Sequence, residues 1–557
     1  MKKLPIGISD YKKVITQGYY FVDKTLLIEE LLSIGYGVTL LCRPRRFGKT
    51  LNLSMLKYFF EKTDESNAYL FDDKKVWQNK SMRSEQGKYP VIFISFKDVK
   101  GDNWENAYKN IATLVANEFE RHAPILLPNL DDYQVERYNI IKTGKADDVL
   151  LGESLLFLSK LLFAHYGQQV VVLLDEYDTP IHAGYKYNYY DKMVNFIKTV
   201  FSKVLKDNVV LKSGVLTGIL RTAKEGIFSD LNNLYVCTML SDKFSDKFGF
   251  TSNEVDLLLE DQDLVDKKPA IKGWYNGYRA GEATFLYNPW SILNCASEHG
   301  KLITYWANTS SNDLIKDLIA RADGSTKTEL ELLLTGIAIT KTIDEAFTFA
   351  GINQMGSSLW SLLLFSGYLT FNKRTVTDDG EYSCFLILPN HEIKALYKKL
   401  INQIFTQTIG NFENITELFN ALITRNVYRI QQLLQQFIIN HVSAFDLAYS
   451  QPEISYHMFV LGLLVTLEGE YAVRSNRESG YGRYDIMLIP HDKSKTGVVI
   501  EFKKTDNETL EQAVDAGLLQ IQDKQYAQEL RAQGVKNIMG YGIAFAGKEL
   551  LVKNITL

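Results

Sequence analysis

The segment from Leu40 to Thr50, LLCRPRRFGKT, constrains the fold of this chain more than any other stretch. The apolar run Val38 to Cys42 predicts a buried strand, and apolar residues recur at helical spacing from Leu51 to Phe59. A loop between a strand and the N-terminus of a helix directs backbone N–H groups and the positive end of the helix dipole at an anion. The segment therefore predicts an α/β fold with a phosphate-binding loop.

The end of this loop carries the residues that a nucleotide requires. Lys49 supplies a positive charge, and Thr50 supplies a hydroxyl suited to Mg²⁺, so we predict ATP and Mg²⁺ as ligands. The pattern G-x-x-x-x-G-K-[ST] starts with a glycine, whereas this chain has Arg43 there. A basic helix cap that binds no nucleotide is the alternative. The candidate nucleotide-binding residues of the loop are Arg45, Arg46, Phe47, Gly48, Lys49 and Thr50.

Two further apolar runs end in polar residues that suit this loop. The run Gln169 to Asp175 predicts a central parallel strand, with Asp175 as a Mg²⁺ ligand and Glu176 as the residue that orients a water toward the γ-phosphate. The other run ends in Thr217, which can sense the γ-phosphate and is a further nucleotide-binding candidate. An ordinary strand end explains Thr217 equally well. Arg221, which follows this strand, could neutralise charge that develops in the transition state, but a solvated surface side chain is the favoured interpretation.

A second set of charged residues lies near the C-terminus. The runs Arg483 to Ile489 and Gly497 to Lys503 alternate as strands, and they carry Asp485 on the first and Glu501 with Lys503 on the second. Two carboxylates can bind Mg²⁺, and a nearby lysine can activate water or neutralise a transition state. The D…E-x-K pattern alone is a weak signal, because solvated E-x-K strand faces are common.

A helix is predicted from about Thr509 to Leu530, after the second of these strands. Gln520 and Lys524 would share one face of it, and Gln522 with Tyr526 has the Q-x-x-x-Y spacing that resembles RecB-like nucleases. Gln520, Lys524 and Tyr526 are therefore candidate nucleic-acid contacts. Helical glutamine and tyrosine are more often plain surface residues.

Several long segments of the chain resemble one bacterial family. They are CRPRRFGKTL, VVVLLDEYDTP, LTGILRTAKEGIFSDLNNL, GWYNGYRAGEATFLYNPWSIL and YWANTSSN. The chain is similar to AAA-ATPase-like proteins that carry a C-terminal nuclease-like domain. This resemblance implies a P-loop ATPase joined to a PD-(D/E)XK nuclease fold, in which Tyr484 takes the place of the motif's proline. The loop also resembles the GPRR-GKT loop of STAND-type ATPases, which implies that the missing first glycine is tolerated.

The length of 557 residues predicts roughly two to four domains. We expect an AAA-like P-loop ATPase domain at 1–312, a helical region at 313–442 and a restriction-endonuclease-like α/β domain at 443–557. In the helical region, a helix near 359–367 and two β-like runs around the turn 378–380 resemble a winged helix, and a packing bridge is the alternative. The GWYNGYR run at 273–279 suits a core around tight turns better than a binding surface.

Composition sets limits on location and partners. The net charge of -4 gives no basic signature, which is mild evidence against constitutive tight binding of nucleic acid. No apolar run approaches the roughly 20 residues that span a bilayer, and the N-terminus lacks a signal-peptide core, so we expect a cytoplasmic protein without a membrane partner. The four cysteines lack metal spacing and predict reduced thiols.

The combined prediction is nucleotide-regulated, metal-dependent cleavage of nucleic acid, with DNA favoured, in defence or mobile-element maintenance. The chain can also form a homo-oligomer. One alternative is a signalling or assembly ATPase whose nuclease-like domain binds nucleic acid without cutting. Another is a nucleotide-binding switch that scarcely hydrolyses ATP.

Overall fold

The computed structural model describes the chain except residues 36, 222–227, 229–230, 283, 307–312, 347–356, 410–412, 446–461, 463–466, 468, 480, 506–507 and 547–548. The chain forms two compact units, Met1–Ser310 with Ala338–Ile393 and Ser311–Ile337 with Lys394–Leu557. The predicted domain boundaries at 312 and 442 stay predictions. The predicted helical region is divided between the two units, since 338–393 belongs to the first.

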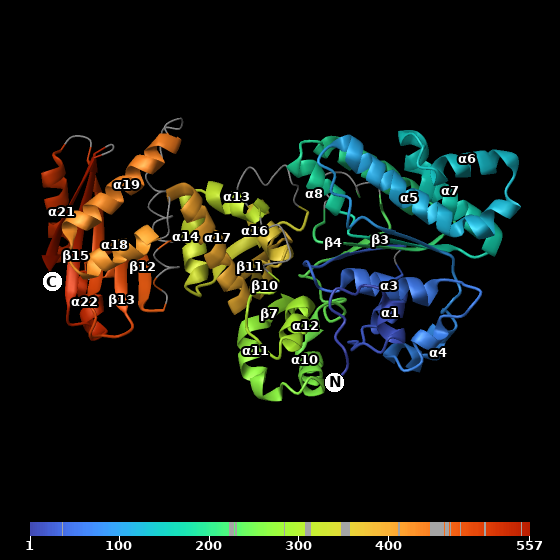
Figure 1. The fold of residues 1–557 in the computed structure, drawn as a ribbon, viewed down its shortest axis with the longest axis horizontal. Helices are drawn as coiled ribbons and strands as arrows, with labels where there is room; N and C mark the ends of the chain where they lie inside the picture. The colour runs from blue at the N-terminus through green and yellow to red at the C-terminus, as the bar shows by residue number, and fades with distance from the viewer. Residues whose placement is uncertain are drawn as a thin grey trace. The chain divides into compact units, whose positions relative to one another are not determined.

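The first unit is built on a five-stranded parallel sheet with the order β2-β3-β4-β1-β5. Two of its inner strands, β1 and β3, are buried along their whole length and are mostly apolar, as the sequence predicted. Figure 1 shows α3 on one side of this sheet and α5 and α7 on the other. The strands are β1 (Val38–Cys42), β2 (Val91–Ser95), β3 (Val170–Asp175), β4 (Leu211–Gly218) and β5 (Leu234–Cys237).

Nine helices surround this sheet in the described part of residues 1–205. They are α1 (Tyr11–Thr16), α2 (Leu26–Ser33), α3 (Lys49–Phe60), α4 (Lys80–Arg83), α5 (Trp104–Leu126), α6 (Asp132–Lys142), α7 (Asp148–Tyr166), α8 (Thr179–Lys186) and α9 (Tyr190–Leu205). The helix α3 begins at Lys49, directly after the loop, so the predicted order of strand, loop and helix is confirmed.

The helix α7 is long and apolar enough to cross a membrane by length and composition, which the sequence analysis did not recognise. Its residues Leu155, Leu158 and Leu162 are buried, and α7 packs against α9 and α5. A core helix passes the same test of length and composition, so α7 is weak evidence for a membrane.

The first unit also contains two small antiparallel sheets. One comprises β6 (Phe250–Thr251), β8 (Thr284–Tyr287) and β7 (Asn276–Ala280), with α10 (Ser252–Asp261), α11 (Lys268–Tyr275) and α12 (Pro289–Ser297) beside it. The tyrosines Tyr275 and Tyr278 of the GWYNGYR run are buried, which confirms the core interpretation of these side chains. All four cysteines are free and buried.

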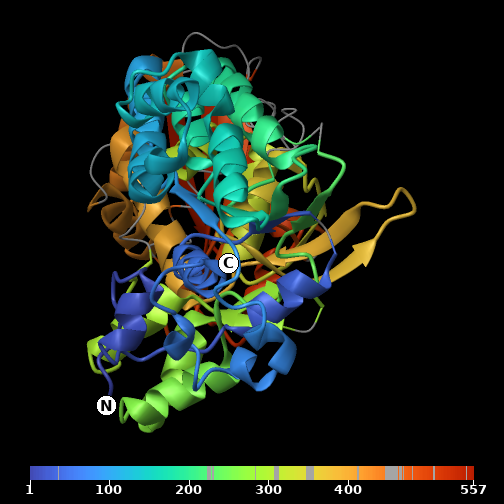
Figure 2. The same ribbon diagram turned by 90° about the vertical axis from the view of Figure 1, so that its right-hand side faces the viewer.

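The other small sheet follows the order β10-β11-β9. It consists of β9 (Ile339–Ile343), β10 (Thr370–Val376) and β11 (Tyr382–Ile387), and α16 (Ser357–Phe365) precedes the hairpin. The predicted helix and hairpin are therefore present, and the hairpin is the projecting orange ribbon at the right of Figure 2.

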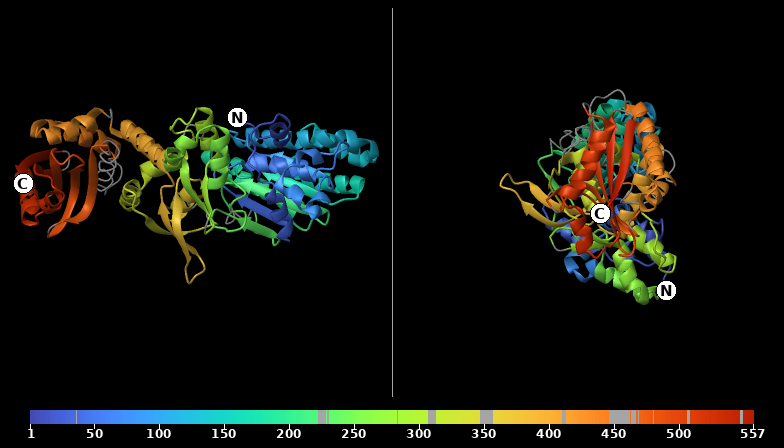
Figure 3. Two further views of the ribbon diagram at one scale, coloured as in Figure 1. Left: turned by 90° about the horizontal axis from the view of Figure 1, so that it is seen from below. Right: turned by 90° about the vertical axis from the view of Figure 1, so that its left-hand side faces the viewer.

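The second unit holds a five-stranded mixed sheet in the order β12-β13-β14-β15-β16, in which only the β14/β15 pair is parallel. Its strands are β12 (Tyr471–Ser479), β13 (Gly482–Pro490), β14 (Gly497–Lys504), β15 (Ile538–Ala546) and β16 (Glu549–Thr556). Helices cover both faces of this sheet (Figure 3). They include α18 (Glu413–Ile423), α19 (Val427–Phe445), α21 (Leu510–Asp523) and α22 (Ala527–Ala532). The other helices of this unit that the structure describes are α13 (Asp313–Arg321), α14 (Gly324–Leu334) and most of α17 (His391–Ile409).

The single helix predicted from Thr509 to Leu530 is wrong. The helix α21 ends at Asp523, and α22 begins at Ala527. Gln525 between them has a left-handed backbone with φ of 54°. The amphipathic segment before β12 lies largely outside the described residues.

Candidate functional sites

The phosphate loop joins β1 to α3 with its lysine in place. Gly48 caps α3 in a left-handed conformation, with φ of 86°, which favours glycine because a Cβ would be strained there. Lys49 Nζ donates hydrogen bonds to the carbonyl oxygens of Arg43 at 3.1 Å and Pro44 at 3.0 Å. The ammonium group thus lies against the loop at the N-terminal end of α3, where an anion is favoured.

Arg43, at the position of the first glycine in the usual motif, is a buried structural residue. Its guanidinium donates to the carbonyl oxygens of Cys42, Cys237 and Thr238 through Nη1 and of Phe244 through Nη2, at 2.8 to 3.2 Å. Its backbone φ is not positive, so the position does not require glycine. The Arg43 side chain therefore links the loop by hydrogen bonds to the end of β5 and the segment that follows it.

The other loop residues predicted to contact nucleotide take different positions. Phe47 is buried and packs edge to face against Tyr278, with 5.2 Å between ring centroids, so its side chain belongs to the core. Arg46 is exposed, and its guanidinium lies 4.4 Å from the centre of the Trp290 ring. The carbonyl oxygen of Arg45 accepts hydrogen bonds from side chains of the same unit, considered below.

Asp175 lies at the centre of a cluster of hydroxyl groups. Thr50 Oγ1 at 2.8 Å and Ser95 Oγ at 3.1 Å donate to Oδ2, and Thr217 Oγ1 at 2.7 Å donates to Oδ1. Burial raises the pKa of Asp175. The cluster brings together Thr50, Asp175 and Thr217, as the sequence predicted. Ser95 was missed, since only the strand order shows that the end of β2 lies beside the end of β3.

Two acids after β3 are placed by the neighbouring strand β4. Glu176 is partly buried, has a left-handed backbone with φ of 50°, and its N–H donates to Thr217 Oγ1 at 3.3 Å. Asp178 is buried, and its Oδ2 accepts from the N–H groups of Ile219 at 2.7 Å and Leu220 at 3.1 Å. Asp178, which the sequence analysis did not select, therefore fixes the chain after β4 against the chain after β3.

In the second unit, Asp485 and Glu501 meet where β13 separates from β14. The ladder between these strands ends at the pair Ile486 and Ile500, and Asp485 Oδ2 then accepts the N–H of Phe502 at 2.7 Å. Glu501 is 3% exposed, and its Oε1 accepts from Lys503 Nζ at 3.2 Å. The predicted set Asp485, Glu501 and Lys503 therefore comes together.

The two carboxyl groups of this centre influence each other. Burial, with a further contribution from the charge of Asp485, raises the pKa of Glu501 to about 7. Burial also raises the pKa of Asp485. The second oxygen of Glu501, Oε2, is buried and has no hydrogen-bond partner among the residues that the structure describes. A cation at this oxygen would compensate both the burial and the repulsion.

Gln520 of α21 connects this centre to Tyr526. Its Oε1 accepts from Lys503 Nζ at 2.5 Å, and its Nε2 donates to Glu501 Oε1 at 2.5 Å and to Tyr526 Oη at 3.0 Å. Tyr526 is 1% exposed, so it supports Gln520 from inside the protein. The pair that forms is Gln520 with Tyr526, and the predicted pairing with Gln522 is wrong because the helix breaks between them.

Lys524, the remaining nucleic-acid candidate, is exposed at the end of α21. The structure records no bond from its ammonium group to the Gln520 network among the described residues. The backbone of Lys524 is still helical, and its N–H donates to the carbonyl oxygen of Gln520 at 3.0 Å, so the two residues lie one turn apart on the same side of α21, as predicted. Their contact with nucleic acid stays a prediction.

No group of three His, Cys, Asp or Glu side chains suited to a metal ion occurs within the described part of the chain. Mg²⁺ is usually bound by one or two carboxylates together with substrate phosphates rather than by a cage of protein ligands. The residues at both centres fit that mode. Thr50 and Asp175 would hold the ion at the phosphate loop, and Asp485 and Glu501 would hold it in the second unit.

Comparison with known proteins assigns both regions. Residues 5–228 match the family described as "Predicted AAA-ATPase", and residues 451–555 match the PD-(D/E)XK nuclease superfamily. The chain joins an AAA-ATPase-like domain to a PD-(D/E)XK domain. The first match contains Lys49 and Asp175, and the second contains Asp485 and Glu501.

One relative extends over nearly the whole chain. A protein of Azotobacter chroococcum mcd 1, named "Uncharacterized protein in vnfD 5'region", is 27% identical over 549 residues, which are 96% of this chain and 94% of the relative. The similarity therefore extends over most of both the AAA-ATPase-like and the PD-(D/E)XK region. The name of the relative assigns no activity.

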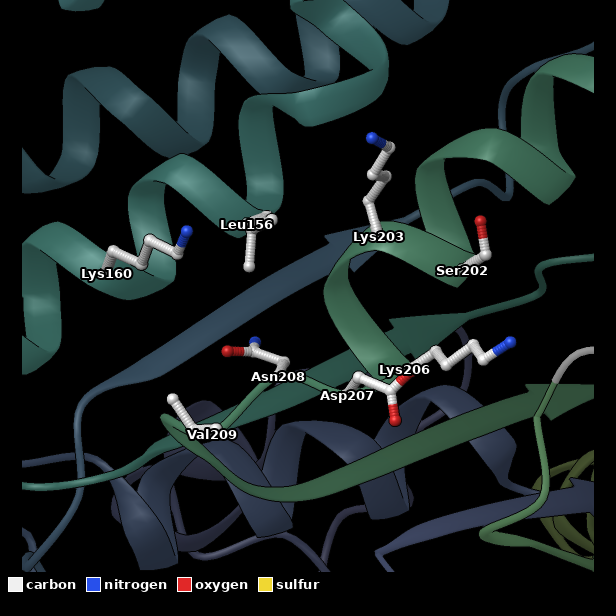
Figure 4. A pocket seen from close by; sticks show the side chains of 8 residues that line it. All are labelled: Leu156, Lys160, Ser202, Lys203, Lys206, Asp207, Asn208 and Val209. Carbon is white, nitrogen blue, oxygen red and sulfur yellow. The ribbon is translucent and has the colours of Figure 1, made fainter.

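The AAA-ATPase-like domain also contains a cavity of about 460 Å³. It lies between α7 and α9 beside the segment that leads into β4, and it is lined by Leu156, Lys160, Ser202, Lys203, Lys206, Asp207, Asn208 and Val209 (Figure 4). Val209 precedes β4, whereas Thr217 lies near the other end of that strand. The cavity is thus at the opposite end of the strands from Asp175 and is separate from the cluster of Thr50, Ser95, Asp175 and Thr217.

Proposed function

We propose that this protein binds and hydrolyses ATP with Mg²⁺ at the phosphate loop and cleaves nucleic acid with Mg²⁺ at the Asp485–Glu501 centre. We further propose that nucleotide occupancy regulates the cleavage. DNA is the favoured substrate, and the cytoplasm is the favoured location. A role in defence or mobile-element maintenance suits the combination of an AAA-ATPase-like domain with a PD-(D/E)XK domain.

At the phosphate loop, the chain supplies positive charge and orientation. Lys49 and the N–H groups at the start of α3 bind the phosphates. Glu176 orients the attacking water, and Thr217, which is bonded to both Asp175 and the N–H of Glu176, senses the γ-phosphate. Bound Mg²⁺ supplies neutralisation of charge on the β- and γ-phosphates.

At the second centre, the chain supplies two carboxylates and a fixed lysine. As an ammonium, Lys503 neutralises charge on the phosphate under attack, and Gln520 holds it in place. Bound Mg²⁺ supplies Lewis-acid stabilisation of the phosphate oxygens.

The observation that carries the nuclease proposal is the buried Oε2 of Glu501, for which the described part of the chain supplies no hydrogen-bond donor. A buried carboxylate oxygen without a donor costs free energy unless a cation or a proton satisfies it. Asp485 is close enough to raise the pKa of Glu501, so both acids can serve one cation. A purely structural pair of acids would be expected to have donors on all its oxygens.

Cleavage assays with four proteins test the proposal. Supercoiled DNA, single-stranded DNA and RNA are incubated with Mg²⁺ or Mn²⁺, with and without ATP. The wild type is compared with Lys49→Ala, Asp485→Ala and Asp492→Ala, a matched control in the exposed turn after β13. We expect the rate of cleavage to change with ATP only in the wild type and in Asp492→Ala. Cleavage that survives Asp485→Ala would exclude the nuclease centre, and phosphate release unchanged in Lys49→Ala would exclude the ATP site.

A second candidate function is a nucleotide-controlled switch that binds nucleic acid without cutting it. The net charge of -4 does not separate this function from cleavage, because it argues against constitutive tight binding of nucleic acid in both cases. The same assays separate the two functions. Binding of DNA without cleavage by the wild type, in Mg²⁺ and in Mn²⁺, would favour the switch.

A further inference from the structure

The outer side of the phosphate loop is packed against segments that lie far from it in the sequence. The carbonyl oxygen of Arg45 accepts two side-chain hydrogen bonds at 3.3 Å, one from Asn288 Nδ2 and one from Trp306 Nε1. A Cβ added at Gly367 would approach Pro44 to 3.0 Å, so the turn before β10 also abuts the loop. The loop therefore cannot shift without displacing these neighbours.

Trp306 is in turn fixed to a buried glutamate. Trp306 is 1% exposed, and its backbone N–H donates to Glu392 Oε1 at 2.7 Å. Glu392 is fully buried, and its other oxygen, Oε2, accepts from Ser291 Oγ at 2.7 Å. Both of these donors are neutral. The carboxylate thus joins three segments, the chain before 307, the first turn of α12 and the start of α17.

Trp306 and Glu392 each lie just before a point where the chain passes from one compact unit to the other. The chain passes between the two compact units three times, after Ser310, after Ile337 and after Ile393. Trp306 lies just before the first passage, and Glu392 lies just before the third. The helix α17 begins in the first unit and continues in the second, which contains Asp485 and Glu501.

We propose that Trp306 and Glu392 are positioning residues that link the phosphate loop to α17, so that nucleotide at the loop alters the part of the chain that leads to the PD-(D/E)XK domain. This inference rests on the proposed binding of ATP at the loop. Phosphates that attract Lys49 away from the carbonyl oxygens of Arg43 and Pro44 change the same loop whose Arg45 carbonyl is bonded to Trp306. By thermodynamic linkage, if nucleotide binding shifts the conformational equilibrium of α17, a change that shifts this equilibrium must in turn alter the affinity of the loop for nucleotide.

Hydrogen exchange of the full chain tests the link with variants of graded severity. Trp306→Phe removes the Nε1–H donor but keeps an aromatic ring, and Trp104→Phe in α5 is its matched control. Ser291→Ala removes one hydroxyl that bonds Glu392 and leaves the ring packing unchanged. Glu392→Ala removes the carboxylate, whereas Glu392→Gln keeps an oxygen for the Trp306 N–H and an amide that can donate to Ser291 Oγ. Binding of a fluorescent ATP analogue is measured for each protein.

In the wild type and Trp104→Phe, we expect ATP with Mg²⁺ to change exchange both at loop residues 43–50 and at α17. In Trp306→Phe, the loop should still respond, while the response of α17 should fall at least about fivefold, as expected for a lost buried hydrogen bond. Ser291→Ala should give an intermediate loss, and Glu392→Gln should retain the response. An α17 response of wild-type size in both Trp306→Phe and Ser291→Ala would overturn the link.

A nucleotide-free comparison separates failure of the link from failure of the ATP site. Without ATP, Glu392→Ala should speed exchange at residues 43–50 by about tenfold, because the N–H of Trp306 loses its buried acceptor. Glu392→Gln should leave that exchange near the wild-type rate. Unchanged loop exchange in Glu392→Ala would overturn the link even if ATP binds normally. If the wild type bound no ATP but Glu392→Ala still exchanged about tenfold faster than the wild type at residues 43–50, the ATP site would be excluded and the link supported.

Discussion

The hydroxyl of Thr50 donates to Asp175 Oδ2 at 2.8 Å, which joins the first turn of α3 to the end of β3. These two residues are 125 positions apart in the sequence, and the parallel sheet brings them together. The same aspartate accepts from Ser95 and Thr217, so one buried carboxylate connects the ends of three strands and a helix. This group is the part of the proposed ATP site that depends most on the whole sheet.

Asp175→Asn is therefore expected to remove ATP hydrolysis with little change in fold. Asparagine keeps the size of the side chain but has one acceptor oxygen for the hydroxyls of Thr50, Ser95 and Thr217, and it lacks the charge that Mg²⁺ requires. We expect phosphate release to fall by at least about 100-fold. Ser95→Ala, which removes one donor to the same oxygen, should change it by less than about fivefold. Similar turnover by Asp175→Asn and wild type would contradict this role.

A second prediction concerns Arg43, where the usual motif has glycine. Arg43→Gly restores the motif but removes a charged donor from four buried carbonyl oxygens, so we expect a loss of about 3 kcal/mol of stability. The first thermal transition should fall by roughly 5 to 10 °C. ATP affinity should not improve, since the backbone at Arg43 does not need glycine.

Arg46→Gly is the matched control for this measurement. Arg46 is exposed and its guanidinium stacks on Trp290, so its loss should cost no more than about 1 kcal/mol. Thermal unfolding followed by circular dichroism compares the two variants. An Arg43→Gly protein as stable as Arg46→Gly would show that the buried guanidinium is not structural.

Sequence patterns predicted the strands well because buried parallel strands are continuous apolar runs. Val38–Cys42 is a strand with the bounds expected, and Asp175 ends its strand as expected. Ser95 could not be chosen in the same way, since its role depends on β2 lying next to β3 in the sheet. Trp306 and Glu392 are 86 positions apart, and no spacing rule connects them.

The helix break at Gln525 was also beyond sequence patterns. Neither glycine nor proline lies between Leu518 and Arg531, so helical spacing extended through the break. The break places the ring of Tyr526 against Tyr484 and its hydroxyl on the carbonyl oxygen of Arg483, at 2.6 Å. Tertiary packing of Tyr526 therefore competes with helix propensity in this segment.

The raised pKa of Glu501 predicts how pH affects the second unit. A carboxyl group whose folded pKa, about 7, is above its usual value of 4.5 stabilises the fold at low pH, and this contribution is lost as pH rises to about 7. Without divalent cations, the melting temperature of this unit should therefore fall between about pH 5 and pH 8. Mg²⁺ or Mn²⁺ should reverse the fall, because the cation binds the ionised form.

Glu501→Gln removes this titration and should flatten the metal-free profile between pH 5 and pH 8. Cleavage by the wild type should increase with pH through about 7, as Glu501 ionises and accepts the cation. Calorimetry at several pH values, with EDTA or Mn²⁺, measures the first effect, and initial rates on DNA measure the second. An equally steep metal-free profile in Glu501→Gln would assign the titration to another group.

The last prediction distinguishes Gln520 from Gln522, which lie two residues apart in α21. Gln520 bonds Glu501, Lys503 and Tyr526, whereas Gln522 is exposed. Gln520→Ala leaves Lys503 without its partner on α21, so we expect cleavage to fall by about 10- to 100-fold through loss of orientation. Gln522→Ala should stay within about twofold of the wild type, since surface substitutions have small effects.

Initial rates of DNA cleavage at saturating Mn²⁺, together with DNA affinity, separate orientation from binding. Loss of rate with unchanged affinity in Gln520→Ala would support the positioning of Lys503 seen in the structure. Tyr526→Phe should give a smaller loss of the same kind, because Gln520 then lacks the hydroxyl that accepts from its Nε2 but keeps Glu501 and Lys503 as partners. A greater loss of activity in Gln522→Ala than in Gln520→Ala would contradict the role given to Gln520 and would favour Gln522 as the partner of Tyr526.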